Sequence, residues 1–285
     1  MPLSMKKLTT TIIMAAATLM SVAQPPMRQW AEKPSAPEDL YTLTVGQVTM
    51  IIDSSKGAKV TSLKYGDKEV LSQMKMPNAW GSTFWTSPQK EWNWPPVREH
   101  DALPYTVKHD GDALVMTSQL SQRFPLRIEK RFEADAADNC IVVTYSIINE
   151  GDAERSVAPW EITRVPARGS IFFDAPVSGI TPAGLMAFVE KNGLAWFDID
   201  HNEKQRKINA DGKGWLSYTH DGLLLTKRFQ DIDASQPAPD EAEIQVYVHN
   251  GDAYVELESQ GDYTKLKPGE KLDWAVRWYL TPADK

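Results

Sequence analysis

Two glutamates separated by a single residue are the clearest candidates for chemistry in this chain. They lie in the segment 253–261, A-Y-V-E-L-E-S-Q-G, as Glu256 and Glu258. In a β-strand, alternate side chains point to the same face, so Tyr254, Glu256, Glu258 and Gln260 would share one face, with the carboxylates about 7 Å apart. If that face lines a cleft, mutual repulsion and burial would raise one pKa and provide a general base or acid. The alternative, favoured for such a strand taken alone, is a solvated outer face.

A second group of polar and aromatic residues lies at 159–164, P-W-E-I-T-R. The alternation of a strand places Glu161 on one face and Trp160 and Arg164 on the other. An arginine near a carboxylate is most often a structural ion pair. Arginine beside tryptophan also suits sugar hydroxyls, because the guanidinium group offers several fixed donors.

Aromatic residues are concentrated in the segment 79–96, A-W-G-S-T-F-W-T-S-P-Q-K-E-W-N-W-P-P, which holds Trp80, Trp85, Trp92 and Trp94. Neither a helical nor a strand period fits its apolar residues, and glycine and proline interrupt it, so a long structured loop is predicted. Such a loop either folds over the protein's own core or forms the wall of a site. Tryptophan suits a site that is apolar on one side and wet on the other, and the apolar face of a sugar ring fits such a wall.

No motif in the sequence supports a metal or a cofactor. Asp198–Asn202 resembles the opening of a calcium loop, but Glu203 and Asn209 stand where glycine and the final glutamate belong. The five histidines show no zinc-ligand spacing, and neither a G-x-S-x-G segment nor a phosphate-binding glycine motif is found. We therefore expect no metal site, no cofactor and no serine-hydrolase chemistry.

The N-terminal segment has the layout of a secretory signal peptide. Two lysines precede an apolar run, and Ser21-Val22-Ala23 forms a small-residue cleavage signal. We expect residues 1–23 to be removed after Ala23, with the natural start at Met1 or Met5, and the product to be periplasmic or secreted. The apolar run is too short and too often interrupted by threonine for a good membrane span. Residues 24–39, rich in proline and polar residues, are expected to form a leader or linker.

The net charge argues against two classes of partner, and the cysteine content argues against a disulfide. The formal net charge is −7, and loss of Lys6 and Lys7 with residues 1–23 would bring it to −9 (−7 − 2). An acidic chain without a basic run argues against nucleic acid and anionic membranes as partners. The single cysteine, Cys140, cannot form an intramolecular disulfide and is expected to be a buried strand residue. The oligomeric state is left open.

From residue 40 onward, short alternating segments are separated by turn signals. Asn-Gly or Asp-Gly pairs stand at 192–193, 221–222 and 250–251, each between apolar-rich runs. Strands recur at the spacing of a sandwich or barrel, and no long amphipathic helix and no fixed-period repeat is found. The sequence predicts one all-β antiparallel domain over residues 40–285.

Four segments together resemble the galactose mutarotase-like (aldose 1-epimerase-like) superfamily, and most closely an exported bacterial branch of it. They are G-A-K-V-T-S-L at 57–63 with K-E-V-L at 68–71, I-E-K-R-F at 128–132 with the strand at 142–149, L-E-S-Q at 257–260, and L-K-P-G-E-K-L-D-W at 266–274 with R-W-Y-L at 277–280. The resemblance covers most of residues 40–281. It implies a β-supersandwich, two large twisted antiparallel sheets with a concave face that binds a monosaccharide.

The same resemblance implies roles for particular residues. Glu258 matches the glutamate that takes the proton from the anomeric hydroxyl in mutarotases. The usual acid, a histidine in an Asn-His-x-Tyr-Phe segment, has no counterpart in S-V-A-P-W-E-I-T-R at 156–164, and a second binding histidine is also missing. Glu161 is then the substitute acid to consider, if burial raises its pKa.

Together these observations predict a protein that binds a monosaccharide or the end of a glycan in a tryptophan-lined cleft. The expected base is Glu258 and the expected acid is Glu161. The ligand-holding residues are expected to be Trp85, Trp92, Trp94, Trp160, Arg164, Glu256 and Gln260. An aldose 1-epimerase-like isomerase and a non-catalytic sugar-binding protein remain as alternatives, with a purely structural role for the aromatic loop behind both. The sequence does not identify the sugar.

Overall fold

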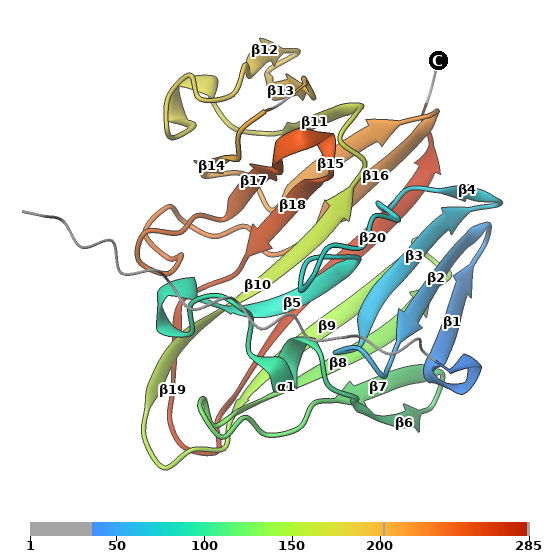
Figure 1. The fold of residues 1–285 in the computed structure, drawn as a ribbon, viewed down its shortest axis with the longest axis vertical. Coiled ribbons are helices and arrows are strands. Elements are labelled where there is room, and N and C mark those ends of the chain that lie inside the picture. The colour runs from blue at the N-terminus through green and yellow to red at the C-terminus, as the bar shows by residue number, and fades with distance from the viewer. Residues whose placement is uncertain (1–35, 202, 284–285) are drawn as a thin grey trace, which may run out of the picture.

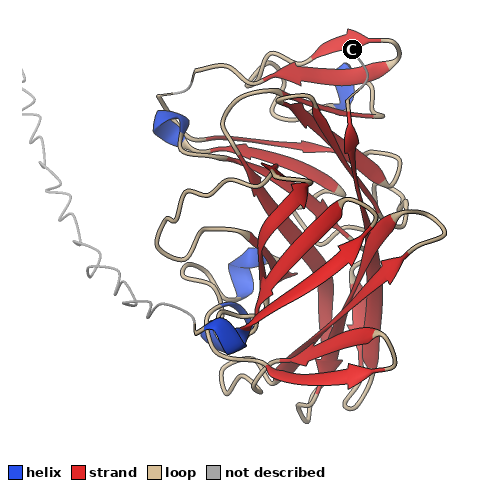
Figure 2. Ribbon diagram, turned by 90° about the vertical axis from the view of Figure 1, so that its right-hand side faces the viewer, coloured by secondary structure: helices blue, strands red, loops and turns tan. Residues whose placement is uncertain are grey.

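The computed structural model describes residues 36–201 and 203–283, and strands make up most of this part of the chain (Figures 1 and 2). The expected signal peptide, residues 1–23, and the leader up to residue 35 lie outside the described residues. Helical segments are short: α1 (Arg98–Asp101) and the single 3-10 turns η1 (Pro37–Asp39), η2 (Gln89–Glu91), η3 (Val177–Gly179) and η4 (Asn250–Asp252). No helix of the described part has the length and hydropathy needed to cross a membrane.

The described residues form two ten-stranded antiparallel sheets. The first sheet runs, in spatial order, β1 (Leu40–Val45), β2 (Val48–Asp53), β3 (Lys59–Tyr65), β5 (Ser82–Ser87), β10 (Arg155–Val165), β18 (Val255–Gln260), β17 (Ile244–Val248) and β14 (Arg206–Ala210), with β4 (Lys68–Glu69) beside β3 and β19 (Thr264–Leu266) beside β10. The second runs β12 (Val189–Lys191), β13 (Leu194–Asp198), β11 (Ser170–Phe173), β15 (Trp215–His220), β16 (Leu223–Arg228), β20 (Lys271–Pro282), β9 (Cys140–Asn149), β8 (Leu126–Asp135), β7 (Ala113–Thr117) and β6 (Thr106–Asp110). The all-β, two-sheet architecture predicted from the sequence is confirmed.

Two of the three predicted turn signals form tight hairpins, and the third, Asn250-Gly251, lies in the longer connection between β17 and β18. Asn192-Gly193 joins β12 to β13 and Asp221-Gly222 joins β15 to β16, each in a tight antiparallel hairpin. Both residues of each pair have positive φ, the conformation that two-residue hairpin turns of this kind require. Cys140 is buried at the start of β9, as predicted.

The prediction of a continuous loop over residues 79–96 was wrong in its first half. Ser82–Ser87 is strand β5, paired with β10 in the interior of the first sheet, and all six of its residues are buried. A strand covered on both faces has no alternation of apolar and polar residues, so its period cannot be recognised. The second half, residues 88–96, is a loop with one short 3-10 turn, as predicted.

The main core lies between the sheets and collects aliphatic and aromatic residues from nearly every strand. A smaller aromatic core, made by Trp85, Trp92, Trp160 and Ile162, lies apart from it. Trp85 pairs directly with Trp160 across β5 and β10, and Ile162 is two residues further along β10. This second cluster therefore covers the other face of the first sheet, the face on which loops and short helices gather in Figure 2.

Candidate functional site

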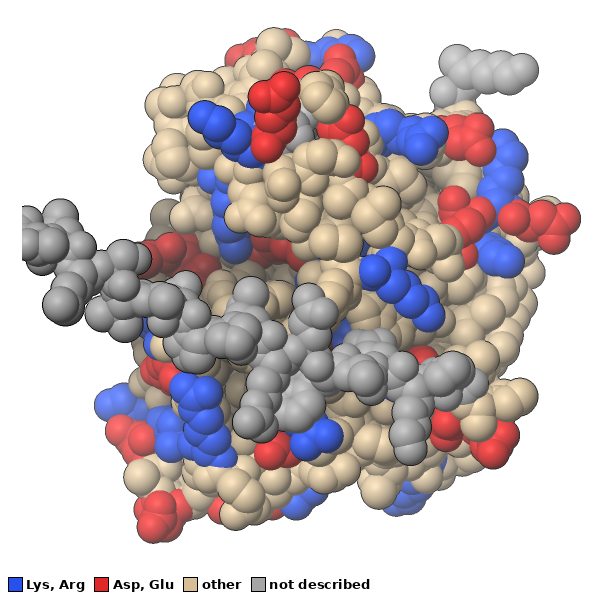
Figure 3. All heavy atoms as spheres, viewed as in Figure 1, with Lys and Arg blue, Asp and Glu red and all other residues tan. Residues whose placement is uncertain are grey.

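A pocket of about 480 Å³ lies on the outer face of the first sheet. Trp85, Trp94 and Trp160 form one side of it, Tyr247, His249 and Tyr254 line it from β17 and the following turn, and Lys207, Glu256 and Glu258 also line it. Its size is within the usual range for small-molecule sites. Figure 3 shows the molecule hollowed on this side, with charged side chains inside the hollow.

Glu258 is the most deeply buried carboxylate of this pocket, with its side chain only 1% exposed. Its Oε2 accepts hydrogen bonds from Trp160 Nε1 at 2.8 Å and from Lys207 Nζ at 2.9 Å. Burial raises the pKa of Glu258 to about 7, against the lowering effect of the Lys207 ammonium. Oε2 is thus held in place, while Oε1 is buried without a hydrogen-bond partner among the described residues.

Glu256, like Glu258, is held in an ion pair, but its partner is an arginine that is itself buried. Arg164 Nη2 lies 2.7 Å from Glu256 Oε1, and Arg164 also donates to the carbonyl oxygen of Trp80 at 3.2 Å. The guanidinium group lies 5.6 Å from the ring centres of both Trp85 and Tyr254. Arg164 is 1% exposed and does not line the pocket. Arg164 thus contacts Glu256, Trp85 and Tyr254 from behind the pocket and holds these three side chains in position.

The predicted tryptophan wall exists, but only part of it faces the pocket. Trp85 contacts Trp160 edge to face at 5.3 Å and Trp94 at 5.8 Å, and these three residues line the pocket. Trp94 is 38% exposed and lies at the surface. Trp92 is 2% exposed, packs behind Trp85 at 5.5 Å, and donates its indole N–H to the carbonyl oxygen of Thr86 at 2.8 Å. Trp92 therefore supports the wall without lining the pocket.

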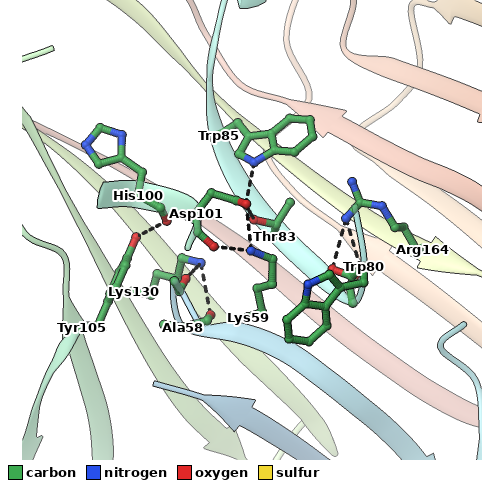
Figure 4. Close-up of polar contacts among 12 residues, drawn as sticks. Ala58, Lys59, Trp80, Thr83, Trp85, His100, Asp101, Tyr105, Lys130 and Arg164 are labelled. Atoms are coloured by element: carbon green, nitrogen blue, oxygen red, sulfur yellow. Dashed lines mark hydrogen bonds and ion pairs between the residues drawn. The ribbon is translucent and has the colours of Figure 1, made fainter. Parts of the chain in front are cut away.

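A buried charged network holds Trp85 from below (Figure 4). Asp101, at the end of α1, accepts hydrogen bonds at Oδ1 from Trp85 Nε1 at 2.8 Å and from Thr83 Oγ1 at 2.5 Å. Its Oδ2 lies 2.9 Å from Lys59 Nζ, and both of these side chains are almost fully buried. A Cβ on Gly57 would lie 2.3 Å from the Asp101 carbonyl oxygen, so glycine is required for α1 to approach β3 this closely. Nothing in the sequence pattern identified Asp101 as part of the site.

Glu161 lies away from Glu258, on the inner face of the first sheet. It is fully buried and forms an ion pair with Lys227 of β16 in the second sheet, and its Oε1 accepts hydrogen bonds from Ser82 and Thr163. The structure therefore does not bring the two glutamates together. The strand alternation that places Trp160 in the pocket turns Glu161 into the core, which argues against its role as acid.

Gln260 is on the predicted face but does not reach this pocket. It is fully buried, and its Nε2 donates to Glu241 Oε2 at 3.1 Å and to Gln245 Oε1 at 3.0 Å. Lys207, Tyr247 and His249 do line the pocket and were not predicted from the sequence. They come from β14, β17 and the turn after β17, neighbours of β18 that only the strand order identifies.

Comparison with solved structures identifies the architecture. The chain superimposes on a candidate aldose 1-epimerase from Escherichia coli K12 with a TM-score of 0.61 and 14% identity, over 85% of this chain and 99% of the other. A galactose mutarotase-like protein from Lactobacillus casei gives a TM-score of 0.60 and 12% identity, over 85% and 100% of the two chains.

A third structure, a TPR-domain containing protein from Parabacteroides distasonis, gives a TM-score of 0.60 and 18% identity. The match covers 86% of this chain and 48% of that one. No protein-family model and no curated protein sequence matches the chain. At such identities the likeness concerns the fold, and activity must be argued from the site. The chain has the fold of the galactose mutarotase-like (aldose 1-epimerase-like) superfamily.

Proposed function

We propose that the pocket binds the ring of a sugar and that the protein interconverts its two anomers, with Glu258 as general base. The observation that carries this proposal is the state of Glu258: a buried carboxylate with a pKa of about 7, one oxygen held by Trp160 and Lys207, and the other without a partner among the described residues. A base with a pKa near neutral pH is the most effective for proton transfer there. The aromatic residues around it suit the apolar face of a sugar.

The proposed reaction is redox-neutral and needs no cofactor. The Glu258 carboxylate takes the proton of the anomeric hydroxyl, the C1–O1 bond becomes a carbonyl, and the bond between C1 and the ring oxygen breaks. An acid protonates the ring oxygen, C1 rotates about the bond to C2, and the reverse steps close the ring as the other anomer. Proton transfers of this kind contribute about 10²–10⁴-fold each to a rate.

His249 is the residue of this pocket best suited to be the acid. It is the only histidine among the described lining residues, and its Nδ1 lies 2.9 Å from the carbonyl oxygen of Asn250. A carbonyl oxygen accepts, so Nδ1 must carry a proton and donate it in that bond. With Nδ1–H held in that bond, Nε2 can give a proton to the ring oxygen of the substrate only from the doubly protonated imidazolium, and it takes this proton back when the ring closes.

The experiment that tests this function is anomer exchange measured by NMR on a panel of aldoses. Wild type should exchange at least one sugar faster than the uncatalysed rate, and Glu258→Gln should lower that rate by at least about 100-fold. Glu190→Gln, an exposed change on β12, is the matched control and should leave the rate unchanged. Exchange at the uncatalysed rate for every sugar would overturn the catalytic proposal.

A second candidate function is sugar binding without catalysis. It is favoured by the ion pair between Lys207 and Glu258, which resembles a fixed polar contact as much as a free base. The absence of the superfamily's usual histidine from residues 156–164 favours it as well. In that case calorimetry would show sugar binding by wild type, while the NMR assay shows no exchange above the uncatalysed rate.

We also propose that the protein works outside the cytoplasm, because residues 1–23 have the layout of a cleavable signal peptide. Expression of the full chain in a bacterium should release a periplasmic or secreted product whose first residue is Gln24. Recovery of a cytoplasmic product that keeps residues 1–23 would contradict this.

A further inference from the structure

A second hollow of about 420 Å³ adjoins the pocket that contains Glu258. Gln89 and Lys207 line both, so the two spaces meet along these side chains. The second hollow lies over β14 and β17, the last two strands of the first sheet, and Asn209, Asp240, Glu241 and Gln245 line it. None of its described lining residues is aromatic.

A chain of amide and carboxylate groups holds the wall of this hollow in place. Gln245 Nε2 donates to Asn209 Oδ1 at 2.9 Å and to Glu241 Oε2 at 3.0 Å. Gln260 Nε2, from below, donates to Glu241 Oε2 at 3.1 Å and to Gln245 Oε1 at 3.0 Å. Gln245 and Gln260 are both at least 99% buried, so the network is fixed before any ligand arrives. Such preorganisation reduces the entropic cost of binding.

The chemistry of this wall suits neutral polyhydroxylated ligands. Amide groups offer both donors and acceptors, and carboxylates offer acceptors, so together they can bind hydroxyl groups that both give and take hydrogen bonds. Asp240 and Glu241 carry negative charge here, and Asp240 is only partly balanced by an exposed ion pair with Lys90 at 3.1 Å. Lys207, the cation that lines this hollow, is already paired with Glu258. An anionic ring, such as a uronic acid, would be repelled from this hollow.

We propose that this hollow is a second sugar subsite, and that the ligand is therefore the end of a neutral oligosaccharide of at least two rings. The inference rests on the proposed function of the first pocket, where the first ring lies beside Glu258. The second ring lies beyond Lys207 and is held through its hydroxyl groups by Asn209 and Glu241, which Gln245 fixes in place. Gln260 is a positioning residue, because it fixes Glu241 and Gln245 without lining either hollow.

The test compares ring number directly by calorimetry. Glucose, galactose and mannose are titrated beside their α-1,4- and β-1,4-linked disaccharides and trisaccharides. For the sugar that binds, the matching disaccharide should bind about tenfold more tightly than the monosaccharide, an increase of about 1.4 kcal/mol. A disaccharide whose second ring is a uronic acid should lose this gain.

Two variants separate the subsite from the first pocket. Asn209→Tyr should fill the hollow and abolish the disaccharide gain while monosaccharide affinity stays within about twofold, and Asn209→Ala should reduce the gain without adding bulk. Gln119→Tyr, at an exposed position away from the hollow, is the control for a new tyrosine. Melting temperatures confirm that each variant folds.

The outcomes of the test distinguish this inference from the function on which it rests. If monosaccharides bind and no disaccharide or trisaccharide binds more tightly, the subsite is overturned and the first pocket stands. If the disaccharide gain survives in Asn209→Tyr, the second ring lies elsewhere and the subsite is again overturned. If no sugar of any length binds, the proposed function fails as well.

Discussion

Glu161 and Glu258 lie on neighbouring strands of one sheet, yet their carboxylates are on opposite faces of it. In the register of β10 and β18, Ile162 is opposite Glu258, and Glu161 is opposite Ser259. Glu258 thus faces the pocket, while Glu161 faces the second sheet and pairs with Lys227. The two glutamates therefore differ in their surroundings: Glu258 lines the pocket, and Glu161 joins the two sheets across the core.

The Glu161–Lys227 pair is expected to control stability without controlling activity. Lys227→Met would leave a buried carboxylate without its cation, which typically costs about 3–5 kcal/mol of unfolding free energy. The double variant Glu161→Gln with Lys227→Met removes both charges and should recover much of that loss. Urea unfolding of the single and double variants measures the coupling. A folded double variant that had lost anomer exchange would show instead that Glu161 acts in the reaction.

Activity should depend on the ionisation of Glu258. Because its pKa is raised to about 7 and the base must be deprotonated, kcat/KM should rise with pH through about 7. The Lys207 ammonium lowers this pKa, so Lys207→Met should move the midpoint to higher pH. The measurement is the pH profile of exchange for both proteins. A profile that is flat from pH 5 to 9 in wild type would argue against Glu258 as the base.

His249→Asn tests the proposed acid. Loss of the proton donor should lower kcat by about 10²–10⁴-fold while KM changes little, because the rest of the pocket is untouched. Unchanged kcat in this variant would transfer the role to another ionisable group of the pocket, of which Lys207 is nearest to Glu258.

Substitution of Trp94 should mainly weaken sugar binding, whereas substitution of Trp92 should mainly lower stability. Trp94 is partly exposed at the pocket, so Trp94→Ala should change stability by less than about 0.5 kcal/mol. It should weaken sugar binding about two- to tenfold. Trp92 is buried in the small aromatic core, so Trp92→Ala should cost about 3–5 kcal/mol of stability. Calorimetry with sugar and urea unfolding of both variants test this contrast.

The sequence could predict those parts of the molecule that depend on local pattern. Alternation correctly placed Glu256 and Glu258 on one face of β18, and placed Glu161 on the face opposite Trp160 and Arg164. What it could not show is which faces meet across strands distant in sequence. Lys207 reaches Glu258 only because β14 pairs with β17 and β17 pairs with β18. Strand β5 was not predicted, because a strand buried on both faces shows no alternation of apolar and polar residues.

Asp101 is expected to affect both the stability of the fold and the position of Trp85 in the pocket wall. Burial alone would raise its pKa, but the ion pair with Lys59 and the hydrogen bonds from Thr83 and Trp85 outweigh burial, and the pKa is lowered from 3.8. A lowered carboxyl pKa gives stability that is fully present above the unfolded-state pKa and is lost as pH falls through the folded-state pKa. Asp101→Asn should therefore be less stable than wild type at pH 7, and the difference should narrow as pH falls below about 4.

The same variant should also disturb the site from a distance. Without the carboxylate, Lys59 becomes a buried cation without its counter-ion, at a typical cost of about 3–5 kcal/mol, and the indole N–H of Trp85 loses a charged acceptor. Sugar affinity should fall although Asp101 does not line the pocket. Urea unfolding between pH 3 and 7 and calorimetry at pH 7 test the two effects. The control is Asp112→Asn in the exposed turn between β6 and β7, which should change neither. A stability difference that stayed constant from pH 3 to 7 would mean that the Asp101 carboxylate is not the group that titrates.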